Sequence, residues 1–271
     1  MLARLPIPAK LRRPLVPVVR LQGVIASGGR MGPVLNDAAL APLLERAFRR
    51  GRPAAVALAI NSPGGSPVQS SLIAARIRRL ADETGVPALA FVEDVAASGG
   101  YWIAAAADEI FVDAGSIIGS IGVIHASFGL HEFIGRHGIE RRIHTAGENK
   151  SFLDPFLPER SRDVARLEAL QRELHELFID HVRARRGEKL ADDPELFTGA
   201  FWLGRRGVEL GLADEVGHLE AVLRERFGPR VRTVPLRQRR PWWQRFGASA
   251  AEGALGRIEE RLMAERYGIA W

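Results

Sequence analysis

Ser98 is the residue of this sequence best placed to do chemistry. It lies in the segment AASGG at residues 96–100 and is followed by the apolar run 103–107. A serine at the start of a buried helix meets unpaired N–H groups and the positive end of the helix dipole. Serine is a favoured helix N-cap, but the same position suits a nucleophile beside an anion site. This segment alone leaves both interpretations open.

Two other glycine-rich turns have similar potential. One is NSPGG at residues 61–65, which ends in Gly65, and the other is GSIG at residues 119–122, which contains Ser120. Adjacent glycines can adopt positive φ and approach a ligand closely. Their N–H groups can then point at an oxyanion. The alternatives are an ordinary tight turn for the first segment and a β-turn for the second.

A serine nucleophile needs a base, and histidine is the first candidate. The seven histidines lie in no catalytic-triad pattern, and the sequence around Ser98 lacks the Gly-x-Ser-x-Gly elbow. No His-Glu-x-x-His spacing indicates a metal site. We therefore interpret all seven as surface or structural residues: His125, His131, His137, His144, His175, His181 and His218.

Lysine is the other established partner of a catalytic serine. Lys150 follows a predicted buried strand and begins an irregular loop, whereas Lys10 lies in a basic arm and Lys189 follows a helix end. Lysine can lose its proton when burial lowers its pKa, and arginine cannot. Lys150 is thus a candidate general base, with a solvated loop lysine as the alternative.

Alternating strand and helix patterns must position these residues. The pattern predicts an α/β fold with a mostly parallel sheet, because continuous apolar runs indicate strands buried on both faces. In such sheets, sites form at the carboxyl ends of the strands. We predict strands at 16–25, 54–60, 87–92, 109–112, 120–125, 139–144 and 231–235, a loop at 94–100, and helices at 36–49, 68–81, 101–107, 129–137 and 160–186.

Composition narrows the class of protein. The 271 residues are 46% hydrophobic and 26% charged, which suits a globular domain, and they include no cysteine, which excludes a thiol nucleophile. The net charge is +6, yet no compact basic motif interleaved with aromatic residues precedes residue 236, so we expect no nucleic-acid partner. No apolar window suggests a membrane span or a signal peptide. We expect a cytoplasmic protein, with peripheral binding to the inner face of the membrane as an option.

The sequence suggests three regions. Residues 1–15 form a basic arm, residues 16–236 the main domain, and residues 237–271 an extension rich in tryptophan and arginine with a predicted amphipathic helix. Aromatic and basic residues together suit a bilayer interface. Packing of this helix on its own domain or on a neighbouring subunit is the alternative.

Four segments in order resemble the signal-peptide peptidase A (SppA) family, including its SohB-like branch: residues 61–65, 97–101, 119–124 and 147–150, the last followed by LDP at 153–155. The resemblance implies a ClpP/crotonase-like fold and a serine endopeptidase with a Ser/Lys dyad. It implies cleavage of signal-peptide remnants or other membrane-derived or unfolded peptides, with no cofactor and no metal. The single copy of each segment matches a short form of the family, and short members build rings. We therefore expect a homo-oligomer, with the 160–186 helix and the C-terminal segment as candidate contacts.

The resemblance also implies roles for individual residues. Ser98 corresponds to the nucleophile, Lys150 to the general base and Ser120 to the hydroxyl that orients the lysine, while the N–H groups of Gly65 and Gly99 correspond to the oxyanion hole. The sequence departs from the family in showing no N-terminal transmembrane anchor. Two functions of other classes remain open: a crotonase-like acyl-CoA enzyme, which shares the fold and oxyanion hole, and an inactive membrane-associated scaffold.

Overall fold

The computed structural model describes residues 13–28, 34–147 and 149–236. Most of the predicted basic arm and the whole predicted extension at 237–271, with its amphipathic helix, lie outside the described residues. The chain divides into two compact units. The first unit comprises the residues up to Ile121 and those from His181 onward, and the second unit is Gly122–Asp180.

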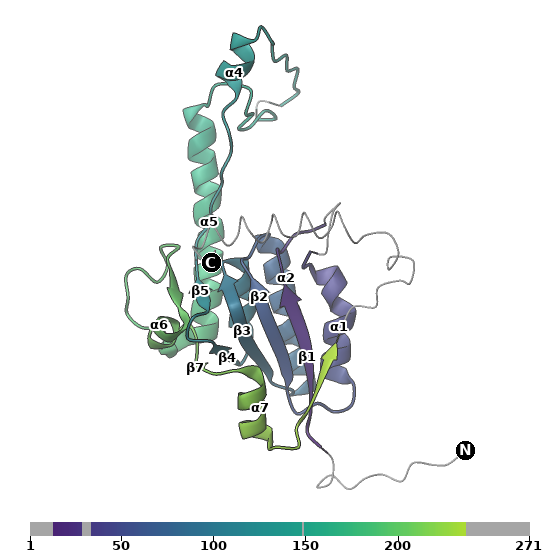
Figure 1. Ribbon diagram of the computed structural model, residues 1–271. Helices are drawn as coiled ribbons and strands as arrows, with labels where there is room; N and C mark the ends of the chain where they lie inside the picture. Colours follow the sequence, from purple (N-terminus) through teal and green to yellow (C-terminus); the bar gives the residue numbers. More distant parts are fainter. Residues whose placement is uncertain (1–12, 29–33, 148, 237–271) are drawn as a thin grey trace, which may run out of the picture. The chain divides into compact units, whose positions relative to one another are not determined.

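Strands and helices alternate along most of the chain (Figure 1). The strands are β1 (Leu15–Gln22), β2 (Val56–Ser62), β3 (Ala88–Ala97), β4 (Glu109–Val112), β5 (Ile117–Gly119), β6 (Phe201–Leu203), β7 (Glu215–Val216) and β8 (Arg232–Leu236). The helices are α1 (Asp37–Arg49), α2 (Pro67–Thr84), α3 (Gly99–Ala105), α4 (His131–Arg136), α5 (Ser161–Arg186), α6 (Gly204–Glu209) and α7 (Leu219–Phe227), with a 3-10 turn at Gly187–Lys189.

The sheet of the first unit is mostly parallel. Its main path runs β6-β5-β3-β2-β1-β8, with β4 pairing with β3 and β7 with β4. Every strand pair formed by the described residues is parallel except β5 with β6. The predicted α/β fold with a mostly parallel sheet and flanking helices is confirmed. The predicted strand at 231–235 is also confirmed, and it pairs with β1 at the sheet edge.

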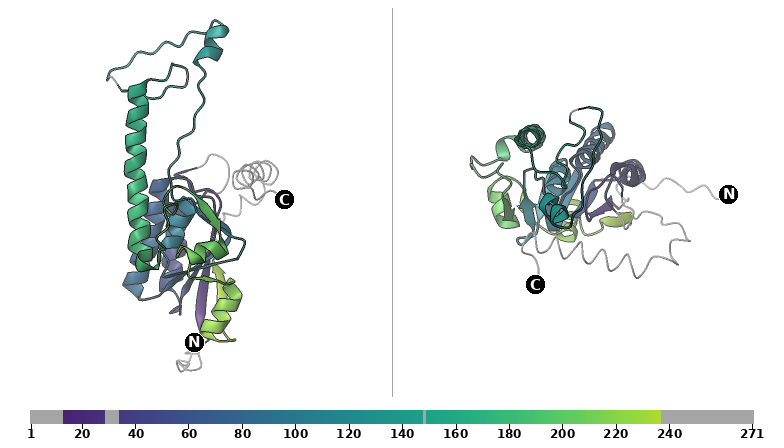
Figure 2. Two further views of the ribbon diagram at one scale, coloured as in Figure 1. Left: turned by 90° about the vertical axis from the view of Figure 1, so that its left-hand side faces the viewer. Right: turned by 90° about the horizontal axis from the view of Figure 1, so that it is seen from above.

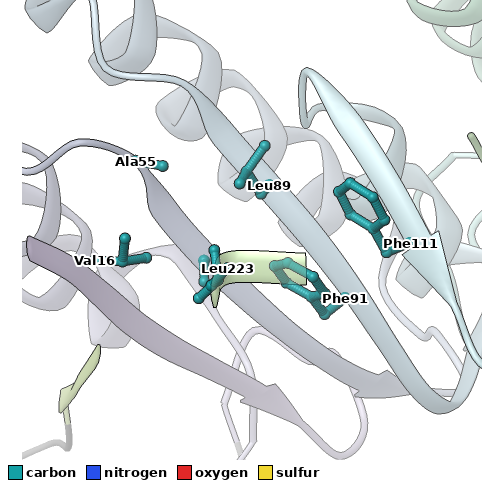
Figure 3. Close-up of a cluster of buried hydrophobic side chains, with 7 residues drawn as sticks. Val16, Ala55, Leu89, Phe91, Phe111 and Leu223 are labelled. Carbon is teal, nitrogen blue, oxygen red and sulfur yellow. The ribbon is translucent and has the colours of Figure 1, made fainter. Parts of the chain in front are cut away.

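Helices cover both faces of this sheet. Helices α1 and α2 run side by side along one face, where α3 also packs (Figures 1 and 2). Helix α7 covers the other face through Leu223, which contacts a buried cluster contributed by four strands (Figure 3). The other members of this cluster are Val16, Ala55, Ala57, Leu89, Phe91 and Phe111. Burial on both faces explains why β2 is apolar throughout its central residues.

The predicted helix starts are mostly correct because local capping sets them. Asn36 caps α1, and its side-chain Oδ1 accepts a hydrogen bond from the N–H of Ala39 at 2.8 Å. Helix α2 begins with Pro67 in its first turn and ends at Gly85, which is left-handed at φ 66°. These signals are local, so the sequence alone carries them.

Three sequence predictions are wrong in places where pairing decides the structure. The predicted loop at 94–100 is largely strand, because β3 continues past an irregularity opposite Ile60 and Ser62 and its last residues pair with β5. The predicted strand at 120–125 is absent, since β5 ends at Gly119 and Ser120 has φ 54°. The predicted strand at 139–144 is likewise absent, because the residues described in the second unit provide no partner strand.

The second unit consists of α4, most of α5 and the turns between them. Helix α4 is shorter than the predicted helix at 129–137, whereas α5 matches the predicted helix at 160–186 to within one residue. Over the described residues, no helix combines the length and apolarity needed to cross a membrane.

Candidate active site

Ser98 occupies a sharp turn between strand β3 and helix α3. Its backbone has φ 51° and ψ −121°, a conformation that costs a non-glycine residue about 1–3 kcal/mol. Hydrogen bonds on both sides hold it there: the Ser98 N–H donates to Gly119 O at 2.9 Å, and the Ser98 carbonyl accepts from Trp102 N at 3.0 Å. A strained serine between a strand and a helix is the geometry of a nucleophile elbow, although the usual glycine spacing is missing.

The Ser98 side chain does not cap helix α3. Ser98 does occupy the N-cap position of α3, but its side chain makes no capping hydrogen bond. The residue is only partly buried. The capping interpretation is therefore wrong for the side chain, whose hydroxyl is not engaged by the helix.

The glycine turn after β2 lies directly against Ser98. Gly64 has φ 103°, and a Cβ there would lie 2.7 Å from Gly99 N and 2.9 Å from Ser98 Cβ. Gly65 has φ 138°, and a Cβ there would overlap the carbonyl of Ile25. Only glycine fits these two positions. Close packing against Ser98 and Gly99 thus explains the glycine at 64, and close packing against Ile25 explains the glycine at 65.

Ile25 and Ser62 fix the direction of this turn. Ile25 N donates to Gly64 O at 2.8 Å, and Ser66 N donates to Ile25 O at 2.7 Å. These two hydrogen bonds form a parallel β-bridge between Ile25 and Gly65. They use the carbonyl of Gly64 and the N–H of Ser66, so the N–H of Gly65 itself points away from Ile25. The buried hydroxyl of Ser62 also accepts from Gly64 N at 3.3 Å. Sequence reasoning missed both residues, since only the pairing reveals them.

Ser120 lies beside Ser98 because their strands are in register. Ala97 pairs with Gly119 across β3 and β5, and each serine is the next residue in its chain segment. Ser120 also has positive φ, 54°, and its N–H donates to Ala200 O at 2.7 Å. The three predicted turns therefore meet at the carboxyl edge of the sheet and bring Gly65, Ser98, Gly99 and Ser120 together.

The glycines after Ser98 let α3 approach the sheet. A Cβ at Gly99 would overlap the Ser70 hydroxyl, and one at Gly100 would overlap the carbonyl of Ser62. Both glycines are buried. Their lack of side chains brings the start of α3, with the N–H of Gly99, close to the turn that carries Gly65.

Lys150 belongs to the second unit, where it lies in a turn with an exposed side chain. Its N–H donates to Gly147 O at 3.3 Å. The prediction that it follows a buried strand is wrong, because residues 139–144 form no strand and are mostly exposed. Its role as general base stays a prediction, as do the roles of Ser98, Gly65, Gly99 and Ser120.

His181 has a structural role, as predicted for the histidines, and it packs against α3, the helix that follows Ser98. Its Nε2 atom is 2.9 Å from Trp102 O, and its ring stacks on Trp102 with centroids 5.1 Å apart. Burial lowers the pKa of His181, and nearby Arg185 lowers it further against the opposing hydrogen bond to Trp102. Within the described residues, no group of His, Asp and Glu could hold a metal ion.

A family model and a sequence relative that match this chain are both named as peptidases. The family model described as Peptidase family S49 matches residues 81–226. A protease named SohB from Haemophilus influenzae is 29% identical over 75% of this chain and 57% of its own length. A solved structure of the 1510-N membrane-bound stomatin-specific protease is similar with a TM-score of 0.46 at 12% identity, covering 84% of this chain and 99% of that one.

A further relative carries a different name. The Na(+)/H(+) antiporter NhaA of Brucella abortus is 46% identical over 94% of this chain but only 37% of its own length. The chain thus spans 37% and 57% of these two relatives. The antiporter name refers to a whole protein of which this chain matches a minor part, whereas the family model matches this chain's own residues, including Ser98, Ser120 and Lys150.

These matches support a serine-type peptidase. With the α/β fold and the strained serine at the carboxyl edge of its sheet, they assign the family: the chain belongs to Peptidase family S49.

Proposed function

We propose that this protein is a serine endopeptidase that hydrolyses peptide bonds with a Ser98/Lys150 dyad through an acyl-enzyme. The observation that carries the proposal is the Ser98 turn. It holds a serine with positive φ and a non-capping hydroxyl against the Gly64–Gly65 turn. Such strain persists only where the surrounding structure enforces it, and it is concentrated at functional sites.

The mechanism follows from the chemistry of these groups. Neutral Lys150 accepts the proton of Ser98 Oγ as that oxygen attacks the peptide carbonyl carbon. The N–H groups of Gly65 and Gly99 stabilise the resulting oxyanion, and the Ser120 hydroxyl accepts a hydrogen bond from the lysine ammonium. Lys150 then returns the proton to the leaving amine. Water, deprotonated by the same lysine, hydrolyses the ester and regenerates Ser98.

We further propose that the working site forms in a homo-oligomer. A neutral lysine at pH 7 requires desolvation, whereas the Lys150 side chain is exposed in the chain. The second unit also exposes large apolar side chains, including Phe128 at 84%, Ile124 at 70% and Phe133 at 59%. A second copy packed on this unit would cover these side chains and shield the lysine.

Apolar substrate residues fit the surroundings of Ser120. Strand β6 lies antiparallel to β5 at the sheet edge and places Phe201, 44% exposed, opposite Gly119. Leu203 in the same strand is 57% exposed. We propose that the substrates are apolar segments, as found in signal-peptide remnants and in other membrane-derived or unfolded peptides.

A peptidase assay on an internally quenched apolar peptide tests the dyad. We expect Ser98→Ala and Lys150→Ala to lower kcat/KM by about 10³-fold or more. Lys150→Arg should be equally inactive, because a guanidinium cannot act as a base. Lys189→Ala, which removes an exposed lysine bound to Asp214, is the matched control. Wild-type activity in Ser98→Ala or Lys150→Ala would exclude the dyad.

Mixing the two inactive variants tests the oligomer. If Ser98 of one copy works with Lys150 of another, an exchanged mixture of Ser98→Ala and Lys150→Ala regains part of the activity. If each dyad forms within one chain, the mixture stays inactive. Light scattering on the same samples measures the assembly, and a monomer with full activity would rule out the oligomer proposal.

A further inference from the structure

Helix α3, which begins directly after Ser98, is short and completely buried. All seven of its residues are buried. Its last turn tightens: Ala106 N donates to Ile103 O at 3.1 Å and Ala107 N to Ala104 O at 3.0 Å, each three residues back. A helix end leaves carbonyl groups without helical partners, and buried carbonyls need other donors.

Two arginines from other helices supply these donors. Arg185 of α5 donates from Nε to Ala105 O and from Nη2 to Ala107 O, both at 3.1 Å. Arg78 of α2 donates from Nη1 to Ala106 O at 3.1 Å. Positive charge at the carboxyl end of a helix also stabilises the helix dipole. The end of α3 is therefore clamped from two sides.

His181 acts closer to the nucleophile. The Trp102 carbonyl is an acceptor, so the proton of the neutral imidazole lies on Nε2 and is donated to it at 2.9 Å. The N–H of the same residue, Trp102, donates to Ser98 O at 3.0 Å. Trp102 thus links His181 to the backbone of Ser98 through two successive hydrogen bonds.

The turn that presents His181 and Arg185 is itself anchored. The next residue, Arg186, has a side chain only 2% exposed and bonds Asp214 at 2.9 Å. Its Nε donates to Gly211 O at 2.7 Å. Asp214 also accepts from Ile110 N at 2.7 Å. This fixed end of α5 gives His181 a rigid base from which to hold Trp102.

We propose that His181 is a positioning residue for Ser98: by donating to the Trp102 carbonyl it holds α3 in place and keeps the nucleophile in its strained conformation. The inference rests on the proposed function in taking Ser98 as the nucleophile. Arg185 and Arg78 support the same helix at its far end. Strain at Ser98 relaxes unless its neighbours over-determine it, and His181 is one hydrogen-bonded residue away.

Two substitutions separate the parts of the contact. His181→Phe keeps a ring that can stack on Trp102 but removes the donor, and His181→Gln keeps an N–H donor at a comparable distance from the backbone. We expect His181→Phe to lower kcat about tenfold, with KM changed less than about twofold; tenfold corresponds to about 1.4 kcal/mol, which is within the range for one hydrogen bond. We expect His181→Gln to restore most of kcat. His218→Phe, which replaces an exposed histidine paired with Asp113, is the control.

Amide hydrogen exchange gives a readout that does not need activity. We expect faster exchange across residues 99–106 in His181→Phe than in wild type or in His181→Gln. Unchanged exchange there, or an equal fall of kcat in the Phe and Gln variants, would overturn the proposal whether or not the dyad is correct. Wild-type activity that survives Ser98→Ala would instead refute the proposed function, while the exchange result still tests the His181 contact.

Discussion

The two units of this chain hold their candidate catalytic residues very differently. In the first unit, Ser98 lies in a turn enforced by buried strands and by direct contact with Gly64. In the second unit, Asp163 and Phe178 are the only described residues that are buried, and Lys150 is exposed. The proposed nucleophile and the proposed oxyanion donors are therefore preorganised by the chain's own core, whereas the proposed base needs further burial before it can act.

Residues other than glycine adopt positive φ in both units, including Leu153 (φ 49°) in the second, but their packing differs. Ser98 and Ser120, both with positive φ, lie next to each other in the first unit, and each has an N–H bonded to a backbone carbonyl. Dense packing can enforce strain because displacement of one group disturbs many neighbours. The described part of the second unit has few buried side chains, so packing cannot hold Lys150 as firmly as it holds Ser98.

The largest difference between the two units is expected in the effect of glycine substitutions on kcat. Gly64→Ala places a Cβ 2.7 Å from Gly99 N at φ 103°, so it must displace the Ser98 turn or the proposed oxyanion donors. We expect kcat to fall by about 10²–10³-fold, as when an oxyanion donor is lost. Gly135→Ala in α4 meets nothing within 4 Å and should keep full activity. A fully active Gly64→Ala enzyme would contradict the preorganised geometry.

An intermediate contrast is expected from phenylalanine truncations. Phe111 is 2% exposed in the core cluster and stacks on Phe91 at 5.0 Å, so Phe111→Ala should lower the free energy of unfolding by about 3–5 kcal/mol. Phe128 is 84% exposed, and Phe128→Ala should change it by less than about 0.5 kcal/mol in the monomer. Urea unfolding at low protein concentration measures both.

The same two variants also test the oligomer contact when unfolding is measured at high protein concentration. If a second copy covers the second unit, Phe128→Ala becomes destabilising as protein concentration rises, because it weakens the assembly. Phe111→Ala should show no such dependence beyond that of wild type. A concentration-independent Phe128→Ala would argue against this surface as the oligomer contact.

The smallest effect is expected from acidification at His181. Burial lowers the pKa of this histidine in the folded protein from its ordinary value of 6.5. The folded state then disfavours the charged form, so this contribution to stability is present above pH 6.5 and is lost as the pH falls below it. Urea unfolding at pH 7.5 and 5.5 should therefore show that the free energy of unfolding falls more in wild type than in His181→Gln. His144→Gln, in the exposed part of the second unit, should behave like wild type, and an equal loss in all three proteins would exclude this titration.

Much of the first unit could be predicted because its signals are local. The apolar run of β2, the Asn36 cap and the glycine turn at 61–65 each define their own structure. The errors lie where strand formation depends on a hydrogen-bonded partner strand. Strand β3 continues through the predicted loop because β5 pairs with it. The predicted strand at 139–144 does not form because the described residues of its unit include no partner strand. An apolar run can be read from the sequence, but its hydrogen-bond partner cannot.

The sequence by itself determined the α/β fold class, the three glycine-flanked turns and the residue types proposed for the chemistry. It could do so because turn and helix-start preferences depend on a few adjacent residues. Only the tertiary structure decided that the Ser98 side chain has no capping hydrogen bond and that Ser98 has positive φ. It also decided that Gly64 lies against Ser98 and that His181, 83 residues later in the sequence, contacts the Trp102 carbonyl. Those features depend on contacts between segments far apart in the chain, which packing of the whole sheet and its helices brings together.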